Sequence, residues 1–347
     1  MSMDTGTLTA LGPRTHEWLF VSEHSSLLPE AILATLTYHD LLSIPLTAVE
    51  VWRFLIRPRG SAFPLPSLPA VERKLQSLVR AGTLSTRSGF YAFPGKEHCI
   101  VERRERHALA QRKWRRLRRV SWWLQAVPFL RMIAGSGSLA REVVRERSDL
   151  DVLLVAQSGR IWTVRFLVTV LLDLFRIRRR PTGPTKDLVC LNHYLTLDGL
   201  HLPYQSLYTA LECARLVPLI GEGVCRAFRD ANRAWMEQFL VRVLPDVAPH
   251  QKRVAGSPLL RSIQRCGEWL LGGWLGDVVE RSLGALQMRR IAPGDKAHTP
   301  GRVVASAVRL EFHPHSREAP LLAEFNLRMA LHGLQAFGEQ RDSGLSV

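Results

Sequence analysis

The sequence is poor in cysteine, and this shortage excludes two kinds of covalent or metal framework. Its 347 residues include five cysteines, an odd number, and no two of them have the C-x-x-C spacing. Neither a disulfide scaffold nor a zinc ribbon is therefore indicated. Small buried thiols are typical of a reducing compartment, which predicts a cytoplasmic protein.

No segment has the pattern of a secretion signal or of a membrane span. Residues 1–15 lack a basic stretch followed by an apolar core, so no signal peptide is evident. The most apolar run, 161–177, is interrupted by Arg165 and Asp173. Charges are costly inside a bilayer, so we expect a buried amphipathic helix here and no membrane span.

Acidic residues are outnumbered by basic ones. The chain has 47 Lys and Arg against 31 Asp and Glu, a net charge of +16. Such an excess fits an anionic partner: a nucleic acid, a nucleotide or an anionic membrane surface. The arginine richness common in high-GC bacterial genomes explains the charge equally well, so charge alone identifies no partner.

Residues 28–100 show three helical patterns followed by a short hairpin. Apolar residues recur at helical spacing from Leu28, a second helix follows Thr47, and a third starts near Ser67. Two short extended stretches then flank the turn at 87–89. This order resembles that of a winged helix. The resemblance implies either nucleic-acid binding, with the third helix in the major groove, or a packing module.

Residues 101–126 form a strongly basic helical stretch that connects this segment to the rest of the chain. Trp114, Leu117 and Val120 recur among the basic residues at helical spacing. One interpretation is a solvated helix with an apolar buried side. The other is a surface that faces phosphates. The basic residues are Arg103, Arg104, Arg106, Arg112, Lys113, Arg115, Arg116, Arg118 and Arg119.

The chemistry-bearing pattern is a Gly-Ser turn between two predicted strands. The strand 127–134 runs into Gly137-Ser138, and a second strand starts with Asp149-Leu150-Asp151. Glycine lets backbone N–H groups approach a phosphate closely. Two residues apart on a strand, the carboxylates share a face, where they repel unless a cation lies between them. Hard oxygen ligands with phosphates suit Mg²⁺.

Gly-Ser followed by Ser-Asp-x-Asp on an apolar strand resembles the signature of the polymerase-beta-like nucleotidyltransferases, especially small bacterial members. The resemblance implies that Gly137 and Ser138 bind a nucleoside triphosphate, with ATP as the first candidate. It also implies that Asp149 and Asp151 coordinate Mg²⁺. The expected reaction is transfer of a nucleoside monophosphate to an acceptor that the sequence does not identify.

The resemblance also implies a third carboxylate, on a later strand, that activates the attacking hydroxyl. Asp187, at the start of the predicted strand 186–195, is our candidate for this third catalytic acid. Asn192 could occupy that place instead. The chain would then lack the carboxylate that acts as a base toward the attacking hydroxyl. The alternative function is then a non-catalytic nucleotide- or DNA-binding protein with a degenerate nucleotidyltransferase fold and a winged helix.

The expected fold is therefore α+β (mixed α/β), in five segments. The C-terminal part has mainly helical patterns and one late strand at 302–312. The segments are a flexible N-terminus (1–27), a winged-helix-like domain (28–100), a basic connecting helix (101–126), a nucleotidyltransferase domain (127–199) and a mainly helical C-terminal region (200–347).

Overall fold

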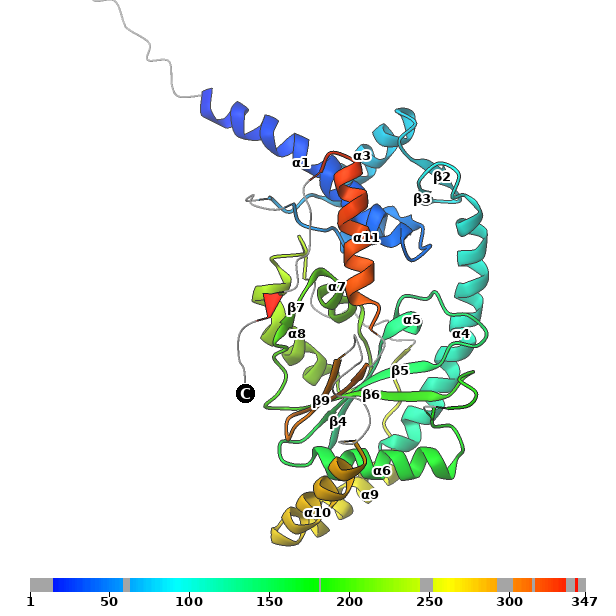
Figure 1. Cartoon of the computed structure of the whole chain (residues 1–347), viewed down its shortest axis with the longest axis vertical. Helices are drawn as coiled ribbons and strands as arrows, with labels where there is room; N and C mark the ends of the chain where they lie inside the picture. The colour runs from blue at the N-terminus through cyan, green and yellow to red at the C-terminus, as the bar shows by residue number, and fades with distance from the viewer. Residues whose placement is uncertain are drawn as a thin grey trace, which may run out of the picture.

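A computed structural model describes residues 15–58, 63–180, 182–243, 252–291, 302–313, 316–334 and 341–342. They form a mixed α/β structure, in which helices surround a central six-stranded sheet (Figure 1). The predicted fold class is confirmed at this level. Residues 1–14 of the expected flexible N-terminus lie outside the described residues.

Three helices and a small sheet form the N-terminal part. The helices are α1 (Thr15–Asp40), α2 (Ala48–Arg53) and α3 (Leu68–Arg80), and the strands are β1 (Leu46–Thr47), β2 (Ser85–Arg87) and β3 (Phe90–Ala92). The strands pair antiparallel in the order β1-β3-β2. Thr47 and Glu50 cap α2 reciprocally, and the Ser67 side chain caps α3. Helix α1 begins at Thr15, earlier than the expected start at Leu28.

Helix α4 (His98–Leu124) connects this part to the central sheet along one side of the molecule (Figure 1). Its buried side includes Trp114 and Leu117, which pack with residues of the sheet. Arg115, Arg116 and Arg119 are exposed. This burial pattern matches the amphipathic interpretation of the basic stretch.

The central sheet has the strand order β8-β4-β5-β6-β10-β9. Strands β5 and β6 are parallel, and helix α6 (Ile161–Leu174) connects them, whereas the other pairs are antiparallel. The strands are β4 (Leu130–Gly135), β5 (Leu150–Ala156), β6 (Val189–Thr196), β8 (Val217–Ile220), β9 (Arg302–Ala305) and β10 (Arg309–His313).

The sheet extends beyond the predicted domain boundary at residue 199. Strands β8, β9 and β10 all come from the C-terminal region, and β8 and β10 flank the strands of residues 127–199. The expected single late strand is in fact a hairpin, because Ser306 closes a turn by accepting hydrogen bonds from the N–H groups of Val308 and Arg309. Apolar periodicity does not reveal which strands pair, so the boundary could not be placed from sequence.

Helices cover both faces of this sheet. Leu153 and Val155 of β5 face one core together with α7 (Leu207–Arg215), α8 (Glu222–Met236) and α11 (Glu318–Leu331). Val152 and Leu154 face the other core, with α4 and α6. The period-two alternation of β5 therefore separates two cores. The remaining elements are α5 (Gly137–Ala140), β7 (Tyr204–Gln205), α9 (Pro258–Leu270), α10 (Trp274–Ile291) and β11 (Arg341–Asp342).

Candidate functional site

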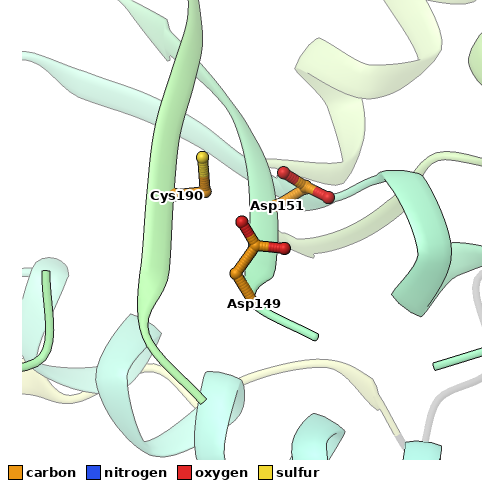
Figure 2. Close-up of side chains that lie close together, drawn as sticks. All are labelled: Asp149, Asp151 and Cys190. Atoms are coloured by element: carbon orange, nitrogen blue, oxygen red, sulfur yellow. The ribbon is translucent and has the colours of Figure 1, made fainter. Parts of the chain in front are cut away.

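The two carboxylates of the Asp-x-Asp pattern lie together at the start of β5. Asp149 directly precedes the strand, and Asp151 is its second residue, on the same face as Leu153. Cys190 of β6 is the register partner of Asp151. One atom from each carboxylate and the Cys190 sulfur all lie within 4.8 Å of one another (Figure 2). The predicted shared face of the two aspartates is confirmed.

The turn after β4 lies directly against this pair. The Ser136 N–H donates to the Asp151 carbonyl oxygen at 3.0 Å. Gly137 has a φ of +59°, in the left-handed region, and a Cβ added there would overlap Asp151 Oδ2. Glycine is therefore required at position 137 for two reasons: it adopts the left-handed backbone conformation readily, and it has no Cβ to overlap Asp151. Ser138, in contrast, is not among the residues that line the adjoining cavity.

A cavity of about 400 Å³ opens beside the aspartates. Residues from distant parts of the chain line it, and they include both acidic and basic groups. They include Ser136, Gly137, Arg141, Asp149, Asp151, Arg179, Asn192, His193, Tyr204, Tyr208, Glu212, Arg302, Glu311, His313, Arg317 and Glu318. Its size falls in the ordinary range of small-molecule sites.

An arginine occupies the position beside Asp149. Nη1 of Arg179 donates to Asp149 Oδ2 at 2.6 Å and to the Cys190 sulfur at 3.3 Å. On the other side, the Asn192 amide donates to Asp151 Oδ1 at 3.1 Å. Arg179 is the middle of three consecutive arginines before β6, and no local pattern indicates which of them turns toward the aspartates.

The environment of Asp151 favours its protonated form. Burial, followed by the charge of Asp149 and then that of Glu212, raises the pKa of Asp151 to about 7. Burial and both aspartates raise the pKa of the Cys190 thiol to about 12. At neutral pH the sulfur therefore carries a proton, and the two carboxylates are the ligands available to a hard cation.

Ion pairs within the protein form the other walls of the cavity. Arg141 of the segment after Gly137 pairs with Glu212 of α7 at 2.5 Å, and Arg302 pairs with Glu318 at 3.2 Å. His193 lies 3.7 Å from Glu311, and burial lowers the pKa of this imidazole to about 3. No local sequence pattern marked Arg141, His193, Glu212, Arg302, Glu311 or Glu318 as part of the site.

A register shift in β6 accounts for the position of His193. Between the pairs Asp151↔Cys190 and Leu153↔His193, β6 contains one residue more than β5. The extra residue turns His193 to the same face as Asp151 and Leu153, whereas regular alternation from Cys190 would direct it away. Such a bulge has no sequence signature in this strand, and only the register reveals it.

Asp187 lies apart from the aspartate pair and has another partner. Its Oδ1 accepts from the buried Nζ of Lys113 at 2.5 Å. Lys113 also donates to the carbonyl oxygens of Glu146 and Ser148, at 3.2 and 2.8 Å. Asp187 therefore joins α4 to the segments before β5 and β6. Asp187 is not among the residues that line the cavity, whereas Asn192 of β6 donates to Asp151.

Comparisons with protein-family models, with curated proteins and with solved structures give no match to this chain.

Proposed function

We propose that the chain is a nucleotidyltransferase that moves a nucleoside monophosphate from a nucleoside triphosphate, ATP first among the candidates, to an acceptor still to be identified. The observation that carries the proposal is the contact of the Gly137 turn with Asp151 at the edge of the cavity. It brings a turn suited to phosphate and a pair of carboxylates suited to a divalent cation to the same point.

The residues present fit a magnesium ion held by two carboxylates. Asp149 and Asp151 would hold it together with oxygens of the triphosphate, while the protonated Cys190 thiol is a poor ligand for a hard cation. Bound there, Mg²⁺ would neutralise charge on the transferring phosphoryl group. Arg179 now neutralises Asp149, and its planar guanidinium can instead pair with phosphate oxygens.

Calorimetric titration of ATP and the other nucleoside triphosphates, with and without Mg²⁺, tests the proposal. The wild-type chain should bind at least one triphosphate only with Mg²⁺, and Asp149→Asn/Asp151→Asn should lose this binding. Asp230→Asn, which changes an exposed carboxylate of α8 outside the cavity, should bind like the wild type. Absence of Mg²⁺-dependent binding by the wild type would contradict the proposal.

A second candidate function is non-catalytic binding of nucleotide or DNA. Asn192, an amide, lies beside Asp151 where an acid would be needed to accept the proton of the acceptor hydroxyl. In addition, the order α1-β1-α2-α3-β2-β3 matches that of a winged helix, and Arg73 and Arg80 on α3 are exposed.

Product analysis and DNA titration discriminate between the two candidates. The enzyme is supported if the chain releases pyrophosphate from a bound triphosphate in the presence of cell extract. This release should be lost in Asp149→Asn/Asp151→Asn. Nucleotide binding without turnover supports the second candidate if the chain also binds duplex DNA. That DNA binding should weaken steeply with added salt and should be lost in Arg73→Gln/Arg80→Gln.

A further inference from the structure

Helices α9 and α10 present large apolar side chains to solvent. Trp269 and Trp274, on either side of the turn between the two helices, are 81% and 77% exposed. Other exposed apolar residues follow at helical spacing on both helices: Leu259, Ile263, Leu270, Leu275, Val278 and Leu286. We call this face, with the arginines described next, the α9–α10 surface. Exposed tryptophans flanked by aliphatic residues indicate a partner.

The charged residues of the two helices divide into acids that have partners within the chain and exposed bases. Each acid has a partner inside the protein: Glu268 pairs with Arg131, Asp277 with Arg160, and Glu280 accepts from the N–H of Trp162. Five exposed arginines remain, and no ion pair to any of them is found among the described residues. They are Arg261, Arg265, Arg281, Arg289 and Arg290.

The α9–α10 surface lies at one end of the molecule and is held firmly. Figure 1 shows α9 and α10 at the opposite end from α1 and α3. Helix α10 packs against α6, where Glu280 accepts hydrogen bonds from Trp162 and Thr163. No helix within the described ranges is long and apolar enough to cross a membrane. A partner would therefore meet a preformed, amphipathic surface from outside.

We propose that the α9–α10 surface docks onto a membrane rich in anionic phospholipid, with the tryptophans and leucines at the level of the headgroups. Arginine stems lie along apolar surface while their guanidinium groups reach phosphates, and tryptophan favours the membrane interface. This inference does not depend on the proposed nucleotide chemistry.

Other occupants fit the same residues less well. Leu259, Ile263 and Leu275 are aliphatic and cannot stack on nucleic-acid bases, so an RNA or DNA strand would leave them exposed. A second copy of the face would bring arginines against arginines, because the acids of both helices already have partners within their own chain. Anionic phospholipid satisfies both the apolar and the basic residues.

Sedimentation of the full chain with vesicles tests the inference. The wild type should bind vesicles of phosphatidylcholine with phosphatidylglycerol and bind pure phosphatidylcholine vesicles much more weakly. Trp269→Ser/Trp274→Ser should weaken binding by at least about tenfold, because the apolar contact is lost. Arg261→Gln/Arg265→Gln should weaken it by about tenfold and reduce its salt dependence.

The matched controls change exposed residues elsewhere in the chain. Leu327→Ser/Leu331→Ser on α11 and Arg73→Gln/Arg80→Gln on α3 should bind vesicles like the wild type. The inference is overturned if the wild type does not bind anionic vesicles, or if the controls weaken binding as much as the tryptophan variant. It is also overturned if the tryptophan variant loses self-association or DNA binding while vesicle binding persists.

Discussion

At the scale of single residues, the candidate site depends on a glycine as much as on its aspartates. The left-handed backbone of Gly137 would cost another residue about 1 kcal/mol or more, and the Asp151 carboxylate occupies the space of the missing Cβ. A side chain at this position would displace the Asp151 carboxylate. The turn and the carboxylate pair therefore form one unit.

Gly137→Ala should lower the free energy of unfolding by about 1–3 kcal/mol and should abolish Mg²⁺-dependent binding of nucleoside triphosphate. The comparison is Gly89→Ala, because Gly89 has a φ of +78° but open space around its Cβ position. Gly89→Ala should lower the free energy of unfolding through its backbone conformation alone, and it should bind nucleotide like the wild type. Equal nucleotide binding by Gly137→Ala and the wild type would contradict the assigned contact.

His39 is a second residue whose environment determines its chemistry. Its Nε2 lies 2.7 Å from Arg215 Nη2, and its Nδ1 lies 2.7 Å from the Thr35 carbonyl oxygen. Because arginine only donates, Nε2 accepts and Nδ1 carries the proton. Burial, with the charge of Arg215 as the next cause, holds the pKa of His39 well below its usual value.

The lowered pKa of His39 predicts a pH dependence of stability. The unfolded chain binds a proton at this histidine below about pH 6.5, whereas the folded chain does not, so stability falls as pH decreases below that value. His39→Gln should reduce the slope by up to about 1.4 kcal/mol per pH unit in urea unfolding between pH 5 and 6.5. An exposed control, His201→Gln, should keep the wild-type slope.

At the scale of elements, Lys113 ties α4 to the beginnings of two neighbouring strands. Its buried ammonium group contacts Asp187 and two carbonyl oxygens of the segment before β5. Lys113→Met should lower the free energy of unfolding by about 2–4 kcal/mol, because these acceptors lose their donor. Arg116→Met, at an exposed position of the same helix, should change it by less than about 0.5 kcal/mol.

The same contact predicts the behaviour of an Asp187 variant. Asp187→Asn keeps the shape of the side chain and removes the charge that pairs with Lys113. We expect lower stability in denaturant unfolding and unchanged affinity for nucleoside triphosphate with Mg²⁺. A loss of pyrophosphate release at full stability would instead restore Asp187 as a catalytic acid.

At the scale of the whole molecule, the central sheet joins segments from both halves of the chain. β8 borders β4, and β10 borders β6, so residues 127–199 alone would expose two unpaired strand edges. A chain cut after residue 199 should show no cooperative thermal transition and should bind a dye for exposed apolar surface. A chain cut after residue 334, which among the described elements loses only β11, should keep the transition.

Local sequence determined the elements that carry the site. The apolar run of β5 predicts a strand, the two-residue spacing places Asp149 and Asp151 on one face, and Gly137 permits the turn beside them. Each of these features follows from residues close together in the chain, because backbone conformation and side-chain direction depend mainly on near neighbours.

Tertiary structure alone decided which residues meet those aspartates. Arg179 and Asn192 reach them from the segment before β6 and from β6 itself, and Glu212 and Glu311 come from elements far along the chain. Their positions depend on strand order and on the bulge in β6. These long-range contacts arise from packing and pairing among distant segments, which no local pattern encodes.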